Sequence, residues 1–286
     1  MIPPLLWAGN AVVGRMVAPL IPPMMFNFLR WFLSLFILLP MASWIFRPGS
    51  GLRSHWRHFA LLGLLGAGLY NALQYLALQT STPLNVTLVG SSGPLWTLAM
   101  GYLFFGARVT RPQMMGAVLS IVGVAIILAR GEWAQLMALQ LVPGDLYMLL
   151  ATISWAWYSW LLARGTAPDG IRNDGTAFLL AQVMFGVGWS GLLAAGEWTL
   201  TDAQIHWGLP LVAALTFVVI GPAVLAYRWW GMGVQRAGPV VAGFFTNLMP
   251  VFAAILSALV LGEMPRPYHA AAFLLIVAGI AISSRR

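Results

Sequence analysis

The sequence predicts an all-α integral membrane protein of ten transmembrane helices, arranged as two inverted five-helix repeats. Composition gives the first reason: of 286 residues, 60% are hydrophobic and 8% are charged, whereas soluble domains are about 45–50% apolar and about 25% charged. Too few charges remain to cover a water-exposed surface, which excludes a soluble enzyme. The other two reasons are apolar runs of membrane-spanning length and an internal repeat.

Ten apolar runs predict the helices in order, because about 20 mostly apolar residues cross the hydrocarbon core of a bilayer. Charges, prolines and glycine clusters separate the runs, and most connections are short. The runs lack the alternation of barrel strands, so a helical bundle is predicted. The expected spans are Pro3–Leu20, Met24–Phe46, Trp56–Leu78, Leu84–Gly106, Pro112–Ala129, Gly144–Ala163, Gly175–Gly196, Trp207–Val234, Val240–Leu261 and Pro267–Ser284.

Arginine positions predict the orientation of these spans. The chain has no lysine and no cysteine, so every basic residue is an arginine and disulfides are excluded. Cytoplasmic loops are enriched in basic residues, so both termini are expected in the cytoplasm. The arginines are scattered singly, which argues against nucleic-acid binding. With this orientation the inner side carries Arg47, Arg53, Arg57, Arg108, Arg111, Arg164, Arg172, Arg236, Arg285 and Arg286, and the outer side carries Arg130 and Arg266.

The second half of the chain repeats the first. Each half contains five spans, and an odd number forces the second half to begin on the opposite side of the membrane. Inverted repeats are typical of transporters with a central site between the halves; the alternative is chance, since proline and glycine are common in membrane helices. The expected repeats are residues 1–130 and 144–286. Matched positions are Pro94 with Pro250, Gly106 with Gly262, Gly123 with Gly279, Gln79–Pro83 with Gln235–Pro239, and Trp7-Ala8 with Trp155-Ala156.

These features resemble the drug/metabolite transporter (DMT) superfamily, specifically its EamA-like family. The resemblance rests on the tryptophan at the start of each half, on Arg30 in the second span, and on the block from Leu76 to Ala129, which recurs from Met232 to Ser283. Leu261-Gly262-Glu263 matches the family's usual ending of the ninth span, whereas the first copy, at Gly106, lacks the glutamate. The tryptophan-rich, lysine-free chain is most similar to the YddG-type aromatic amino-acid exporters of that family.

Polar side chains within the third span are candidates for a substrate site. Asn71, Gln74 and Tyr75 share one helical face, and polar groups in a membrane are expected to face the bundle interior. They are predicted to line a cavity; the alternative is that they hydrogen-bond neighbouring helices as packing contacts.

Aromatic residues at matched places in the two halves are further candidates. Trp155 and Tyr158 in the sixth span correspond to Trp7 and Asn10 in the first. Large rings suit apolar or aromatic substrates. Packing against lipid is the alternative for each ring.

Prolines interrupt the fourth and ninth spans at equivalent positions. A proline removes a backbone hydrogen bond and permits a kink, so Pro94 and Pro250 are expected at gating or helix-kink positions, with shape-setting alone as the alternative. Ser91 and Asn247 lie three residues before these prolines and are predicted to bind substrate.

Arg30 is a charge inside a predicted span. A structural role is favoured, in which the side chain reaches the interface or binds backbone carbonyls. The alternative is that it holds a substrate carboxylate.

The remaining acidic and histidine residues indicate no chemistry. No aspartate or glutamate lies near mid-membrane, and the histidines have no partner at metal-ligand spacing. No catalytic residue, metal or cofactor is therefore expected, and the chain is not expected to be an enzyme. A monomer suffices, because two inverted halves complete a site within one chain.

The resemblance and the candidate cavity together predict an inner-membrane exporter. Small amphipathic metabolites, first aromatic and other apolar amino acids, would move by alternating access through a central cavity. The alternatives are export of other metabolites or drugs, or a nucleotide-sugar-type carrier. A channel or an intramembrane lipid enzyme is disfavoured, because polar residues cluster at mid-depth and catalytic groups are missing. The expected partners are a small-molecule substrate and the lipid bilayer.

Overall fold

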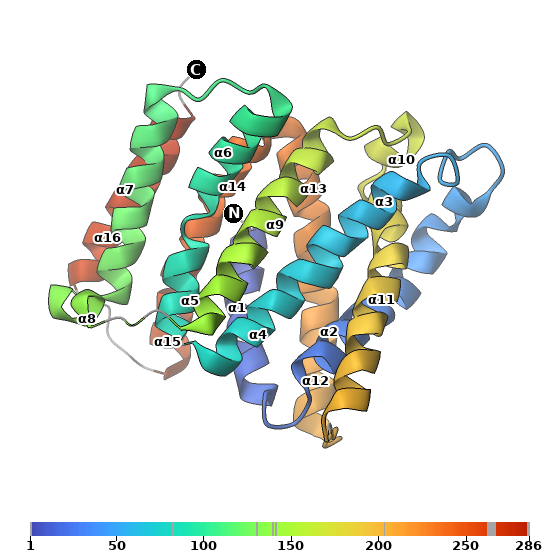
Figure 1. Cartoon of the computed structure of the whole chain (residues 1–286), viewed down its shortest axis with the longest axis horizontal. Coiled ribbons are helices and arrows are strands. Elements are labelled where there is room, and N and C mark those ends of the chain that lie inside the picture. Colours follow the sequence, from blue (N-terminus) through green and yellow to red (C-terminus); the bar gives the residue numbers. More distant parts are fainter. Residues whose placement is uncertain are drawn as a thin grey trace.

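The protein is an all-helical membrane bundle. The computed structural model describes residues 2–81, 83–129, 131–138, 140, 142–202, 204–261 and 267–284, and within these ranges it contains helices and no strand. Six helical stretches are long and apolar enough to cross a membrane, and shorter apolar helices complete the bundle (Figure 1). The predicted fold class is confirmed.

The helical stretches follow the predicted spans in order. Three short helices, η1 (Ser43–Phe46), α8 (Trp133–Met137) and α10 (Asp169–Asn173), lie in the connections. The first half contains α1 (Ile2–Val17), α2 (Pro23–Ala42), α3 (Trp56–Leu62), η2 (Gly63–Tyr70), α4 (Asn71–Thr80), α5 (Pro83–Gly90), α6 (Gly93–Phe105) and α7 (Arg111–Leu128). The second half contains α9 (Pro143–Arg164), α11 (Gly175–Leu200), α12 (Leu209–Val218), η3 (Val219–Leu225), α13 (Ala226–Ala237), α14 (Pro239–Phe245), η4 (Thr246–Leu248), α15 (Met249–Leu261) and α16 (Pro267–Ser283).

Local sequence sets the helix boundaries. Thr110 precedes α7 and forms a capping box with Gln113, whose side chain accepts a 3.0 Å hydrogen bond from the Thr110 backbone N–H. Asp174 caps α11 by accepting hydrogen bonds from the next helical N–H groups at 2.9 and 3.1 Å. Gly106 ends α6 with a φ of 62°, a left-handed conformation that glycine adopts without steric cost.

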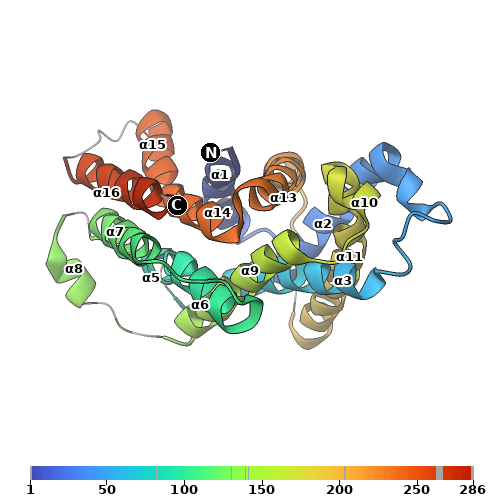
Figure 2. The same cartoon turned by 90° about the horizontal axis from the view of Figure 1, so that it is seen from above.

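The bundle has two layers related by an approximate two-fold axis. Seen from above, α1, α13, α14 and α16 form one row, and α3, α9, α6 and α7 form the other (Figure 2). The repeat partners α7 and α16 pack together at one edge, and α2 and α11 pack together at the other. Each layer therefore combines one helix from one half with three spans of the other half.

Reciprocal glycine contacts between α7 and α16 show this symmetry at the level of residues. A Cβ added at Gly116 would lie 2.5 Å from the Gly279 carbonyl oxygen, and a Cβ added at Gly123 would lie 2.9 Å from the Ala272 carbonyl oxygen. At the offset that relates Pro94 to Pro250, Gly116 corresponds to Ala272 and Gly123 to Gly279. One contact thus maps onto the other, as an inverted repeat requires.

Replacing Gly116 by alanine is expected to destabilise the α7–α16 pair. The added methyl group meets backbone, which cannot move aside as a side chain can, so the helices must separate at a cost of about 1–3 kcal/mol. The melting temperature of the detergent-solubilised protein measures this. Gly188→Ala in α11 is the control, because its Cβ would meet nothing within 4 Å. Equal melting temperatures for the two variants would contradict the packing described.

Two π-helices interrupt spans that the sequence predicts as continuous. η2 and η3 occupy equivalent places in the third and eighth spans, since Gly66 and Pro222 are separated by the repeat offset. A π-helix has wider turns and a different hydrogen-bond pattern from an α-helix. The Gly66 carbonyl oxygen accepts a hydrogen bond from Tyr227 Oη at 2.8 Å, and the Pro222 carbonyl oxygen accepts one from Trp7 Nε1 at 3.2 Å. Each π-helix is therefore held by a side chain of the other half.

The loop arginines that the structure describes gather at one end of the bundle. The connections that contain Arg47, Arg108 and Arg172, and the last turn of α13, which contains Arg236, all lie at the end where α16 finishes, at the top of Figure 1. This arrangement agrees with the positive-inside pattern. The orientation itself stays a prediction. Arg130, Arg266, Arg285 and Arg286, together with Gly262 and Glu263, lie outside the described residues.

Candidate substrate-binding site

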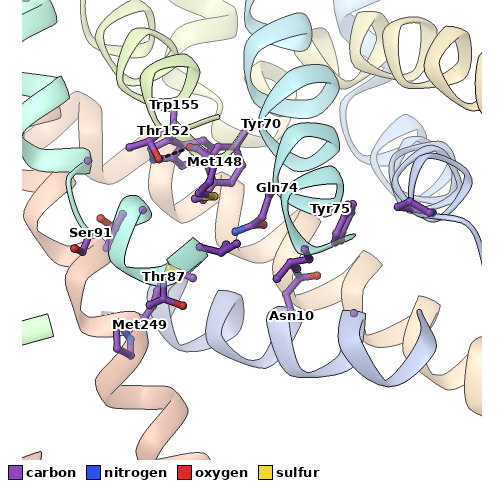
Figure 3. Close-up of a pocket in the computed structure, with 18 of the residues that line it drawn as sticks. Asn10, Tyr70, Gln74, Tyr75, Thr87, Ser91, Met148, Thr152, Trp155 and Met249 are labelled. Atoms are coloured by element: carbon purple, nitrogen blue, oxygen red, sulfur yellow. Dashed lines mark hydrogen bonds between the residues drawn. The ribbon is translucent and has the colours of Figure 1, made fainter. Parts of the chain in front are cut away.

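A cavity of ≈ 520 Å³ lies between the two halves. It extends from the α1–α2 connection, at Ile21 and Pro23, to Trp155 near the middle of α9. Side chains from α1, α4, α5, α9 and α15 surround it (Figure 3). Its volume is within the range of small-molecule sites.

Most of the predicted substrate-binding residues line this cavity. Gln74 extends into it from α4, and Trp155 closes its deep end (Figure 3). Pro250 also lines it, whereas Pro94 lies in the first turn of α6, outside the lining. The predicted residues that the cavity brings together are Asn10, Gln74, Tyr75, Ser91, Trp155 and Asn247. Their role in binding substrate stays a prediction.

The breaks at Pro94 and Pro250 have a common form. Each proline lies in the first turn of a helix, where its missing N–H removes no hydrogen bond. α5 and α6 are separated by a turn at Ser91 and Ser92, and α14 and α15 by the short helix η4. Both breaks bring backbone to the cavity wall, which includes Ser91 and Asn247.

Several lining residues were not among the predicted site residues. Tyr70 and Thr152 line the cavity, and the Thr152 hydroxyl donates to the Met148 carbonyl oxygen at 2.8 Å. Thr152 lies three residues before Trp155, on the same helical face. The spacing of three residues from Trp155 is therefore a sequence signal from which Thr152 could have been predicted as a lining residue.

The cavity wall is mostly apolar, and three of its residues carry a buried polar atom without a hydrogen-bond partner. Tyr75 Oη, Trp155 Nε1 and Asn247 Nδ2 have no hydrogen-bond partner in the part of the chain that the structure describes. Among the described lining residues there is no aspartate or glutamate. The wall therefore offers aromatic and aliphatic surface together with amide and hydroxyl side chains such as Gln74 and Ser91.

An aromatic cluster fills the bundle beyond the deep end of the cavity. Trp155 lies at its centre, with ring-centroid distances of 4.7 to 5.5 Å to five neighbouring rings, and the members come from four different spans. Five of the six side chains are buried, Tyr70 is half-buried, and the rings are in contact with one another, so they close this end of the cavity. We define the aromatic cluster as Trp7, Tyr70, Trp155, Tyr158, Tyr227 and Trp230.

The other three predicted binding residues lie in or beside the aromatic cluster. Trp7 and Tyr158 are members of it, and Tyr158 Oη donates to Gln182 Oε1 at 2.9 Å. Asn71 Nδ2 donates to its own repeat partner, Tyr227 Oη, at 3.2 Å. None of the three lines the cavity. Trp7 and Asn71 each bond to a helix of the other half, and Tyr158 connects two helices of the second half.

Arg30 is buried beside the cavity. Its side chain is 1% exposed, so it does not reach the membrane interface. Its Nη1 lies 3.5 Å from Asn10 Oδ1, and its guanidinium carbon lies 4.8 Å from the centre of the Trp31 ring. Its Nε has no hydrogen-bond partner, and Arg30 makes no ion pair within the described ranges.

Two inverted repeats that enclose a cavity at their interface are typical of helical membrane transporters. The chain belongs to the EamA-like transporter family, whose model matches residues 1–129 and 142–285. The predicted membership of the DMT superfamily is thereby confirmed.

Two relatives of the chain carry transporter names. The uncharacterized transporter YyaM of Bacillus subtilis is 25% identical over 82% of this chain and 75% of its own length. A probable amino-acid metabolite efflux pump of Salmonella typhimurium is 24% identical over 97% of this chain and 90% of its own length. A solved crystal structure matches with a TM-score of 0.76 at 22% identity, covering 98% of this chain and 93% of that one. The structural match supports the fold.

Proposed function

We propose that the protein exports small amphipathic metabolites, with aromatic and other apolar amino acids as the first candidates. The carrying observation is the cavity between the halves, whose wall combines aromatic rings, aliphatic surface, amides and hydroxyls. The similarity to a relative named as an amino-acid metabolite efflux pump supports the same substrate class.

We further propose that export proceeds by alternating access in the bacterial cytoplasmic membrane, with both termini in the cytoplasm. In this orientation the cavity lies toward the outer side, because its wall includes the α1–α2 connection. The aromatic cluster then closes the cytoplasmic side. A continuous polar pore would be needed for a channel, and the buried rings of the aromatic cluster argue against one.

Counterflow in proteoliposomes tests the substrate class. Vesicles loaded with unlabelled phenylalanine, tryptophan or leucine are expected to accumulate the same labelled amino acid. Sugars, nucleotide-sugars and cationic drugs complete the panel and represent the alternative carriers. Failure to accumulate any amino acid would overturn the proposal.

Within this assay, Gln74→Ala is expected to reduce uptake roughly 10- to 100-fold, because one hydrogen bond to a charged ligand group contributes about 1.5–3 kcal/mol. Gln113→Ala is the matched control, since Gln113 caps α7 away from the cavity. Rates are compared per amount of folded protein from size-exclusion chromatography. Equal uptake by Gln74→Ala and the control would refute the assignment of Gln74 to the binding site.

A further inference from the structure

We infer that the cavity selects ligands bearing a carboxylate, and that Arg30 is the positioning residue that sets this preference through Asn10. The inference rests on the proposed function, whose substrate class it narrows from amphipathic metabolites to those with an anionic group. Arg30 itself does not line the cavity.

The first step is the unbalanced charge of Arg30. A guanidinium has five donors and no acceptor and stays charged in proteins. Here it is 1% exposed, its Nε has no partner, and its position opposite Trp31 supplies only the electron-rich face of a ring. A buried charge is normally paired, and an anion in the adjacent cavity, held on the far side of Asn10, would partly balance the charge of Arg30.

The second step is the orientation of Asn10. Since Arg30 can only donate, the Asn10 amide must turn its Oδ1 toward Nη1, at 3.5 Å. This leaves Asn10 Nδ2, a donor, for the cavity that Asn10 lines (Figure 3). The Arg30 charge polarises this amide and thus strengthens it as a donor to an anion.

The third step is the character of the remaining polar wall. The partnerless atoms of Tyr75, Trp155 and Asn247 are buried rather than open to the cavity, so the donor offered to an anion is Asn10 Nδ2. The described lining contains no carboxylate that would attract an ammonium group. The Asn10 donor and the nearby Arg30 charge together favour a carboxylate over an amine, while the apolar wall accommodates the rest of the ligand.

Three analogues with one ring but different charges test this selectivity. Labelled phenylalanine uptake is measured in competition with 3-phenylpropionate, an anion, and with phenethylamine, a cation. The wild-type protein is expected to be inhibited by 3-phenylpropionate at concentrations about tenfold lower than by phenethylamine. Equal inhibition by the two analogues would overturn the inference. Inorganic phosphate is added separately, and stronger inhibition by phosphate than by 3-phenylpropionate would overturn the assignment to a carboxylate.

Asn10→Asp distinguishes a charge effect from a structural one. The new carboxylate would pair with Arg30, so inhibition by 3-phenylpropionate is expected to weaken about tenfold and inhibition by phenethylamine to strengthen. A variant that merely disturbs packing would weaken both alike. An unchanged ratio between the two analogues would contradict the role of Arg30.

A melting experiment decides the charge of Arg30 even if no amino acid is transported. Asn10→Asp is expected to raise the melting temperature of the purified protein, because it supplies the missing counter-ion. Gln182→Glu is the control. Gln182 is a buried amide beside Tyr158, and its conversion to an acid is expected to lower the melting temperature, because the new carboxylate has no counter-ion there. If Asn10→Asp lowers the melting temperature as the control does, Arg30 is not an unbalanced charge. Absence of transport alone would overturn the proposed function.

Discussion

Replacing Gly14 by leucine is expected to reduce transport roughly 10- to 100-fold while the protein stays folded. Gly14 lines the cavity from α1, and a Cβ there would meet only Tyr75 Cε1, at an ordinary contact distance of 3.6 Å. The backbone therefore tolerates a side chain, whose branched end must enter the space that a substrate would occupy. Counterflow rate and melting temperature, measured on the same preparation, separate the loss of transport from the loss of folding.

Gly188→Leu is the matched control for this substitution. Gly188 lies on an exposed part of α11, and a Cβ there would meet nothing within 4 Å. The leucine is expected to contact lipid and to leave the transport rate unchanged. A Gly14→Leu protein that transports as fast as Gly188→Leu would show that the cavity is not the substrate path.

Replacing Trp155 by alanine is expected to produce the second large effect, a loss of both stability and closure. The ring contacts five members of the aromatic cluster and forms the deep end of the cavity. Removing a buried tryptophan costs about 3–5 kcal/mol. The void would also join the cavity to the far side of the bundle, so saturable uptake is expected to give way to leakage of labelled mannitol from proteoliposomes.

Trp157→Ala is the control from the same helix. Trp157 is half-buried, and its ring contacts Phe104 and Phe105 and no member of the aromatic cluster. We expect this variant to retain saturable uptake and to hold mannitol. If Trp155→Ala also held mannitol and kept its uptake, the aromatic cluster would not be the closed end of the cavity.

The bilayer explains why so much of the fold was predictable from the sequence. A membrane span must be apolar and of nearly fixed length, so hydropathy and charge alone locate the membrane-spanning stretches, including the interrupted ones, although they leave out the short connecting helices η1, α8 and α10. The breaks near Pro94 and Pro250 also leave a sequence signal. The π-helices leave a weaker sequence signal, because hydropathy does not report which carbonyl oxygen accepts a hydrogen bond from which N–H group. For η2, the local indication is the group of glycines at 63, 66 and 68.

The candidate site was less predictable, because sequence gives the depth of a residue better than its direction. Asn71 and Gln74 share a helical face, yet Gln74 lines the cavity and Asn71 bonds to Tyr227 of the other half. Trp7 and Trp155 are repeat partners, yet only Trp155 lines the cavity. The cavity extends toward one end of the bundle only, so a residue in one repeat can line it while the equivalent residue in the other repeat does not. No pattern in the sequence indicates which of the two does.

The paired π-helices give the bundle a place to rotate its helices without bending them. Each hydrogen bond of a π-helix spans one residue more than that of an α-helix, i to i+5 instead of i to i+4. If the extra residue in η2 were redistributed so that the turn became α-helical, the segment that follows would turn about its axis by about 100°. Gln74 and Tyr75 would then leave the cavity wall and other side chains of α4 would replace them. η3 occupies the equivalent place in the second half. The helix segment after η2 could therefore rotate while the segment after η3 keeps its position, or the reverse.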